Sequence, residues 1–209
     1  MALVAALLAG YLLGSIPTGV LMARWVDRID LLRTGSGHTG GTNVARATKK
    51  TWPGVVTVLL DMLLGAASVL VARLISDSVW APALAGAAVI VGHNWSILIG
   101  FRGGVGLACM AGMLVAQAML PGIVTGAAFI LVWLGLRKLL RHDARATVIA
   151  LLVIPTSLLL QRQPPHLLAS SVLGVLASMA PSLMDWRREY ERNEGVLGQI
   201  GVNTEVAER

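Results

Sequence analysis

Residues 33–46 read RTGSGHTGGTNVAR, a polar, glycine-rich segment that separates two long apolar runs, residues 2–22 and 52–75. Glycines let backbone N–H groups approach an anion closely, and the arginines at both ends of the segment add positive charge. A shorter segment of the same kind, GFRGGVG at residues 100–106, also follows an apolar run. Two such segments beside membrane-length runs indicate a protein that handles phosphorylated molecules at a membrane face.

The composition is typical of a membrane protein. Hydrophobic residues make up 56% of the chain and charged residues only 13%, about half the charged fraction of a soluble domain, which is roughly 25%. A membrane-crossing helix needs about 20 mainly apolar residues. We expect seven such segments, at residues 2–22, 52–75, 79–99, 104–119, 122–136, 146–160 and 167–184. The predicted fold is all-α, a single polytopic domain over residues 1–186 followed by a polar cytoplasmic tail over residues 187–209.

The distribution of positive charge predicts the orientation of these segments. With seven crossings, 15 of the 17 Lys and Arg residues fall on one side, and only Arg73 and Arg162 fall on the other. Cationic side chains near span ends accumulate in the cytoplasm. We therefore expect the N-terminus outside, and the C-terminus and both glycine-rich segments in the cytoplasm. Pro121 separates the fourth segment from the fifth, and merging the two would place the cations of residues 137–145 outside.

Several classes of site are disfavoured by the residue types. Cys109 is the only cysteine, and the four histidines show no metal-ligand spacing, so we expect no disulfide and no metal site. The net charge of +6 fits the positive-inside bias and contact with anionic lipids, and we expect no nucleic-acid partner. Asp61 lies within an apolar run, where a carboxylate is costly, and we expect it to pair with an arginine or with helix ends.

Two motifs admit more than one interpretation. The sequence GSIPTG at residues 14–19 could serve helix packing through its small residues. Alternatively, Pro17 kinks the helix and opens a lateral groove through which an acyl chain reaches the cytoplasmic face. In the first glycine-rich segment, His38 could act as a base for Ser36, but no Asp or Glu is near in sequence to orient it. A covalent serine mechanism is therefore disfavoured, and the order of a P-loop is missing.

These residues resemble the bacterial integral-membrane acyl-phosphate:glycerol-3-phosphate acyltransferases. The matching blocks are GSIPTG at residues 14–19, Gly35-Ser36-Gly37 with Gly40, Thr42, Asn43 and Arg46, and Gly92-His93 with Phe101, Gly103, Gly104 and Gly106. The resemblance implies seven transmembrane helices in the bacterial plasma (inner) membrane, with the active face in the cytoplasm. It implies transfer of a fatty acyl group from acyl phosphate to position 1 of glycerol 3-phosphate, which forms lysophosphatidic acid for phospholipid synthesis without a cofactor.

The resemblance also implies roles for individual residues. Ser36 and Arg46 correspond to catalytic residues that grip the phosphate or glycerol group. The expected substrate-binding residues, for acyl phosphate and glycerol 3-phosphate, are Gly35, Gly37, Thr42, Asn43, His93, Arg102, Gly103 and Gly104. Among them, Gly103 and Gly104 correspond to backbone donors near the acyl phosphate.

The chain departs from the family pattern at several positions. Val105 and Leu64 each replace a lysine, His38 replaces an asparagine, and the closing Arg-His-x-x-Asn motif has no counterpart. These departures leave a second interpretation open, a catalytically inactive paralogue that binds lipid or a membrane partner. A third, a small transporter of anionic lipid, is suggested only by the number of spans and by Asp61.

Overall fold

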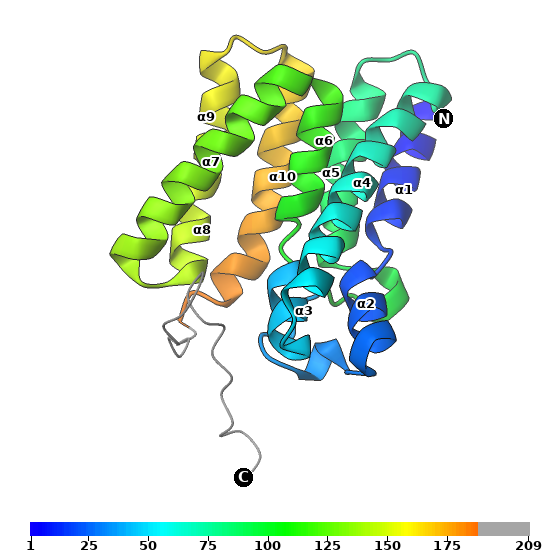
Figure 1. Ribbon diagram of the computed structural model, residues 1–209. Helices are drawn as coiled ribbons and strands as arrows, with labels where there is room; N and C mark the ends of the chain where they lie inside the picture. The colour runs from blue at the N-terminus through cyan, green and yellow to red at the C-terminus, as the bar shows by residue number, and fades with distance from the viewer. Residues whose placement is uncertain (188–209) are drawn as a thin grey trace.

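The structure is a computed structural model that describes residues 1–187. Its regular secondary structure within that range is helical, apart from an isolated bridge between Ser96 and Arg102 (Figure 1). The α-helices are α1 (Ala2–Gly14), α2 (Thr18–Asp27), α3 (Gly41–Thr48), α4 (Thr51–Ile75), α5 (Trp80–Asn94), α6 (Leu107–Gln117), α7 (Met119–Leu140), α8 (Asp143–Leu151), α9 (Val153–Leu160) and α10 (Pro165–Met184). Two short 3-10 helices, η1 (Leu31–Arg33) and η2 (Ile97–Ile99), lie in the connections. The all-α prediction is confirmed, and the predicted tail, beyond Arg187, lies outside the described residues.

Five stretches of helix are long and apolar enough to cross a bilayer. They are Ala2–Asp27, Thr51–Ile75, Met119–Leu140, Asp143–Leu160 and Pro165–Met184. Two of them join successive helices, because α1 continues into α2 and α8 into α9. The apolar helices α5 and α6 are shorter, with 15 and 11 residues. The outer faces of the bundle carry exposed leucines, which suits contact with lipid. The protein is therefore a multi-pass membrane protein.

The helix boundaries differ from the predicted segments around Pro121. The fourth predicted segment, residues 104–119, is helical only over α6, and α7 is longer than the predicted residues 122–136. Ala118 is extended and separates the two helices, while Pro121 lies in the first turn of α7. A first-turn proline removes no helical hydrogen bond. Consequently α7 extends further toward the basic residues, and Arg137 and Lys138 belong to its last turn.

The sixth predicted segment, residues 146–160, is divided at Leu152 into α8 and α9. Pro155 explains the division, because a proline has no N–H to donate to the carbonyl four residues earlier, here that of Leu151. Side-chain hydrogen bonds connect both α8 and the end of α9 to α7. Trp133 donates to Thr147 at 3.0 Å, and the Gln161 amide donates to Thr125 at 3.0 Å.

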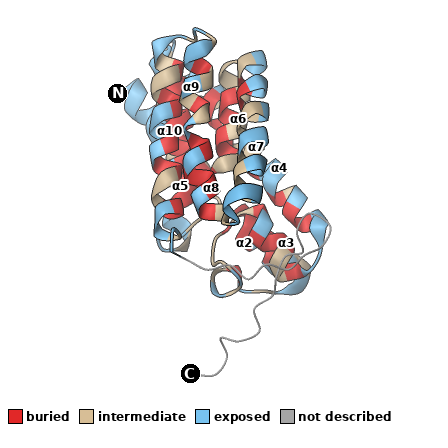
Figure 2. Ribbon diagram, turned by 90° about the vertical axis from the view of Figure 1, so that its left-hand side faces the viewer, coloured by how far each residue is buried: buried red, intermediate tan, exposed pale blue. Residues whose placement is uncertain are grey.

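Glycines allow the central helices to approach one another closely. A Cβ at Gly14 of α1 would collide with the backbone of Val89 in α5, and one at Gly65 of α4 would collide with the backbone of Cys109 in α6. Small residues at helix crossings are the usual means of tight packing in membranes. The packing interpretation of Gly14 is thus confirmed. Figure 2 shows the buried residues concentrated along α5, α6 and α10, whereas α7 contributes few.

The connections that carry the two glycine-rich segments lie at the same end of the bundle. In Figure 1 this is the lower end, where α2 and α3 lie and where α10 ends. The N-terminus and the connection between α4 and α5 lie at the opposite end. The alternation of helix directions therefore places both segments together, as the sequence predicts.

Candidate active site

The first glycine-rich segment is half loop and half helix, and no helix was expected there. Gly40 is the N-cap of α3, with an extended backbone at φ −72° and ψ 159°, and the helix begins at Gly41. Thr42, Asn43 and Arg46 therefore project from a helix. The first-turn N–H groups of such a helix have no partner within it and attract anions. Thr42 lies in that first turn and is exposed.

Asn43 fixes the shape of the loop half. Its side-chain NH₂ donates to the carbonyls of Thr34 at 3.0 Å and His38 at 2.9 Å. Its side-chain oxygen accepts from the Ser36 N–H at 3.0 Å. The predicted role of Asn43 was that of a substrate ligand, but its amide is used within the segment. Gly35, at φ +60°, has no room for a Cβ because the Asn43 oxygen lies there.

Arg46 is the cation of this segment that is built into the site. Its side chain lies beside Gly35, with Cδ 3.6 Å from the position that a Cβ of Gly35 would occupy. Its Nε atom is buried and has no hydrogen-bond partner among the described residues. Leaving a charged donor buried and unpaired costs about 1–3 kcal/mol or more. An anionic ligand would remove that cost, and arginine matches phosphate oxygens with two parallel hydrogen bonds.

The second glycine-rich segment folds back onto the end of α5. The Phe101 N–H donates to the Ser96 carbonyl at 2.8 Å, and the Ser96 N–H donates to the Arg102 carbonyl at 3.2 Å. This reversal makes use of the left-handed backbone of Gly100 and Phe101, with φ of 70° and 57°. It presents the following pair of glycines to His93. Arg102 itself is exposed.

Gly103 and Gly104 lie against His93 so closely that neither position has room for a side chain. A Cβ at Gly103 would meet the His93 carbonyl oxygen, and a Cβ at Gly104 would meet the His93 ring. The Gly104 N–H, expected to face an acyl phosphate, donates to the His93 carbonyl at 3.1 Å. The Gly103 N–H has no hydrogen-bond acceptor within residues 1–187.

The two glycine-rich segments touch at Gly103. Its carbonyl oxygen accepts from the Thr39 N–H at 3.3 Å and lies 3.3 Å from Nδ1 of His38. Thr39 is buried at this junction. Segments that are more than 60 residues apart in sequence therefore form one site at one end of the membrane domain.

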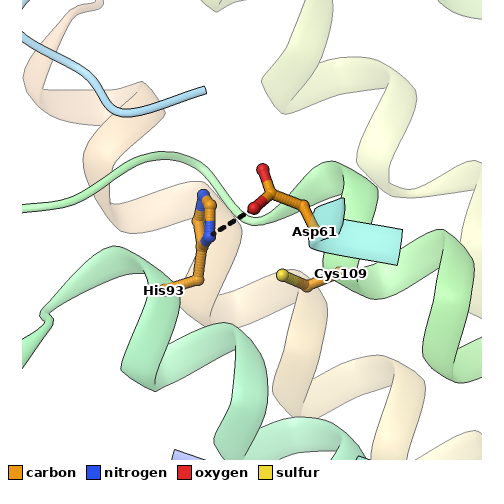
Figure 3. A group of neighbouring side chains, drawn as sticks. All are labelled: Asp61, His93 and Cys109. Carbon is orange, nitrogen blue, oxygen red and sulfur yellow. Dashed lines mark ion pairs between the residues drawn. The ribbon is translucent and has the colours of Figure 1, made fainter. Parts of the chain in front are cut away.

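Asp61 and His93 form a buried pair beside this junction (Figure 3). The His93 Nδ1 atom lies 3.8 Å from a carboxyl oxygen of Asp61, which also accepts a hydrogen bond from the Thr18 hydroxyl. The prediction that Asp61 pairs with an arginine or with helix ends is wrong. The carboxyl group instead uses a histidine from α5 and a hydroxyl from α2, neither of which sequence position reveals.

Cys109 completes a group that the spacing in the sequence did not reveal. Its sulfur and the nearest ligand atoms of Asp61 and His93 all lie within 4.8 Å of one another. Cysteine, histidine and aspartate are zinc ligands. The carboxyl oxygen of Asp61 that faces His93 also accepts a hydrogen bond from the Thr18 hydroxyl. The buried carboxyl group therefore has a hydrogen-bond partner within the chain.

An apolar groove lies where α1 breaks and α2 begins. Residues 15–17 interrupt the helix, and Pro17 is the N-cap of α2. The groove has a volume of about 470 Å³ and is lined by Ile16, Thr18, Leu21, Met22, Trp25, Leu60, Leu63, Leu64 and Ala67. Thr18 joins it to the buried pair through Asp61. The structure thus contains the lateral groove that the Pro17 kink predicted, together with the packing role of Gly14.

Sequence reasoning missed two features of the site. One is the contact of the Thr18 hydroxyl with Asp61, which requires α2 and α4 to be neighbours. The other is Asp185, whose carboxylate lies 2.7 Å from Nε2 of His38. The second supplies the acidic partner that His38 lacks in the nearby sequence. No local pattern could have indicated it, because the two residues are 147 positions apart.

Comparison with known proteins identifies the family. Residues 4–192 match the model of the glycerol-3-phosphate acyltransferase family. A glycerol-3-phosphate acyltransferase of Allorhizobium ampelinum is 38% identical over 178 residues, which cover 84% of this chain and 83% of the relative. One of Synechococcus sp. strain CC9902 is 36% identical, with 92% and 94% covered.

Solved structures agree with the sequence relatives. The crystal structure of PlsY (YgiH), an integral membrane glycerol 3-phosphate acyltransferase, in its glycerol 3-phosphate form is 28% identical, with a TM-score of 0.76. The match covers 90% of this chain and 92% of that one. Its lysophosphatidic acid form has a TM-score of 0.75 at 27% identity, with 92% and 96% covered. The family model, the sequence relatives and the solved structures all match most of the chain. The chain therefore belongs to the glycerol-3-phosphate acyltransferase family.

Proposed function

We propose that the protein transfers a fatty acyl group from acyl phosphate to the position 1 hydroxyl of glycerol 3-phosphate. The products are lysophosphatidic acid, for phospholipid synthesis, and phosphate. The observation that carries this proposal is the junction of the two glycine-rich segments at Gly103, beside an Arg46 side chain whose buried Nε has no partner among the described residues. Structural relatives were solved with glycerol 3-phosphate and with lysophosphatidic acid, which supports the acceptor and the product.

In this proposal the first glycine-rich segment holds glycerol 3-phosphate. Arg46 pairs with its phosphate, and the Ser36 hydroxyl and the Thr42 N–H in the first turn of α3 donate to it. Gly35 and Gly37, both with positive φ, keep the loop tight enough for this approach. Asn43 acts through the shape of the loop.

The second segment receives the acyl phosphate. The Gly103 N–H is the backbone donor, and Arg102 supplies the cation that Val105 does not. His93 fixes the position of the glycine pair. The acyl chain lies in the apolar groove. Thr18 lines this groove and bonds to Asp61, which lies beside His93 and the second segment.

The chemistry makes modest demands on the protein. The glycerol 3-phosphate hydroxyl oxygen attacks the acyl carbon, the bond from that carbon to the phosphate oxygen breaks, and phosphate leaves with the hydroxyl proton. Phosphate is a good leaving group, so no strong protein base is needed. The site accelerates the reaction by holding both substrates in line and by stabilising negative charge with cations and N–H groups.

We also propose seven crossings of the bacterial plasma membrane, with the N-terminus outside and the site at the cytoplasmic face. The two short helices α5 and α6 lie alongside the five long stretches (Figure 1) and count as the remaining crossings. The excess of Lys and Arg at the end that carries both glycine-rich segments supports the cytoplasmic assignment.

The purified protein should form lysophosphatidic acid from palmitoyl phosphate and radiolabelled glycerol 3-phosphate, with one phosphate released for each product molecule. Thin-layer chromatography of the lipid product and a phosphate assay measure the two. Palmitoyl-CoA should give no product. Absence of product with palmitoyl phosphate would reject the enzyme and favour an inactive lipid-binding paralogue. Equal rates with palmitoyl-CoA would show that the donor is assigned wrongly.

Filling the groove should shorten the preferred acyl chain. Ala67 lies seven residues beyond Leu60 on α4, about 10 Å along the helix axis, at the end of the groove away from the glycine-rich segments. Ala67→Phe should lower the rate with palmitoyl phosphate relative to decanoyl phosphate by about tenfold, because overpacking an apolar site costs roughly 1–3 kcal/mol. Leu70→Phe, on the exposed side of the same helix, is the control. An unchanged chain preference for Ala67→Phe would remove the groove from the acyl site.

A further inference from the structure

His38 is placed between three segments of the chain at the site. It lies in the loop half of the first glycine-rich segment. Its Nδ1 lies 3.3 Å from the carbonyl oxygen of Gly103, and its Nε2 lies 2.7 Å from a carboxylate oxygen of Asp185. Asp185 is the residue directly after α10. The ring therefore joins the first segment to the second and both to the end of the last helix.

Both nitrogens of the ring face oxygens that accept hydrogen bonds. A neutral imidazole has one N–H and would leave a lone pair directed at an oxygen lone pair, whichever nitrogen carried the proton. Only a doubly protonated ring can donate to both Gly103 and Asp185. The short distance to the carboxylate is typical of a charge-assisted hydrogen bond.

This arrangement also argues against His38 as a base for Ser36. The His38 backbone N–H donates to the Ser36 hydroxyl oxygen at 3.4 Å. The ring nitrogens instead face the Gly103 carbonyl and the Asp185 carboxylate. His38 and Asp185 thus resemble a base and its orienting acid in composition, although their geometry is that of an ion pair.

We propose that the His38–Asp185 ion pair is a clamp that positions the two glycine-rich segments against each other. The proposal rests on the acyltransferase function given above. The Gly103 carbonyl receives donors from both Thr39 and His38, so the pair fixes the plane of the Gly103–Gly104 peptide. It thereby sets the distance between the two glycine-rich segments, which hold the two substrates in the proposed reaction. In this role His38 and Asp185 are positioning residues.

A double-mutant cycle tests the clamp. His38→Ala and Asp185→Ala should each lower kcat/KM for glycerol 3-phosphate by about tenfold, because small displacements of reacting groups are costly. The double variant should lose less than the sum of the two single losses, since both single variants remove the same ion pair. Additive losses, or no loss in either single variant, would overturn the proposal.

The Lys50–Asp27 ion pair provides a matched control. Its nitrogen–oxygen distance is also 2.7 Å, and it lies at the same end of the bundle without joining the glycine-rich segments. Asp27→Ala should leave kcat/KM unchanged. A loss equal to that of Asp185→Ala would mean that any ion pair at this end affects the rate, and the clamp would be rejected.

Amide hydrogen exchange followed by mass spectrometry gives a reading that does not depend on activity. In His38→Ala and in Asp185→Ala, peptides covering residues 33–46 and 95–106 should exchange faster than in wild type, and a peptide from α7 should not. Unchanged exchange in the two segments would overturn the clamp even if the rates fall. If wild-type protein makes no lysophosphatidic acid, the proposed function fails, and the exchange result alone decides the clamp.

Discussion

Arg46→Ala is expected to lower kcat/KM for glycerol 3-phosphate by about a hundredfold without destabilising the protein. Hydrogen bonds to charged groups contribute about 1.5–3 kcal/mol each, and each 1.36 kcal/mol is tenfold in rate. The free energy of unfolding should stay the same or rise. The buried Nε atom has no partner among the described residues, so its removal leaves no acceptor without a hydrogen bond. A loss of rate without a loss of stability is the mark of a residue that serves a ligand.

Steady-state kinetics and the apparent melting temperature in detergent measure the two effects. Arg33→Ala is the matched control, since Arg33 lies in the same connection but is exposed and pairs with Asp30 at 3.4 Å. It should change neither quantity. Arg46→Lys should recover only part of the rate, because an ammonium group cannot make two parallel hydrogen bonds to phosphate. An Arg46→Ala variant with wild-type kinetics would withdraw the proposed phosphate site.

Gly103→Ala should reduce activity to the background of the assay. The added Cβ would collide with backbone atoms of His93 and Asn94, which belong to the last turn of α5 and cannot rotate away as a side chain could. The second glycine-rich segment must then move, and the contact of its carbonyl with Thr39 is lost. A displacement of about 1 Å can cost a hundredfold in rate, and here both substrates lose their alignment.

Gly126→Ala controls for the substitution itself. Gly126 lies within α7, and a Cβ added there would meet no atom of another residue within 4 Å among the described part of the chain. Alanine at this position should therefore leave both rate and folding unchanged. The product assay and size-exclusion chromatography compare the two variants. Substantial activity in Gly103→Ala would mean that the approach of this segment to α5 is not required for catalysis.

Much of the fold follows from the sequence because long apolar runs can do little else in a bilayer. The runs that became α4 and α10 were predicted nearly to their ends. The boundaries near Pro121 and the division at Leu152 were not, since a proline in a first turn and one that breaks a helix look alike in an apolar stretch. The helix α3 was missed because its glycines and polar residues are also typical of a loop.

For the candidate site, the sequence indicated the two glycine-rich segments that meet at Gly103, but it did not indicate the contacts that their residues make. Glycines interleaved with hydroxyl and cationic residues indicated phosphate binding before any geometry was known. The partners of Asp61 and His38 come from other helices, so only the packing of α2, α5 and α10 reveals them. Asn43 shows the converse, because its residue type fits a ligand while its surroundings make it part of the loop framework.

The groove beside the α1–α2 break has a consequence for how a long-chain donor would arrive. Its walls include residues such as Leu21 and Leu63, which are exposed on the outer face of the bundle. A donor can therefore slide in from the surrounding leaflet by two-dimensional diffusion. Bringing each CH₂ into water would cost about 0.8 kcal/mol, or roughly 12 kcal/mol for a palmitoyl tail. In the proposed reaction only the headgroups would meet the aqueous phase, and the lipid product would leave through the same apolar groove.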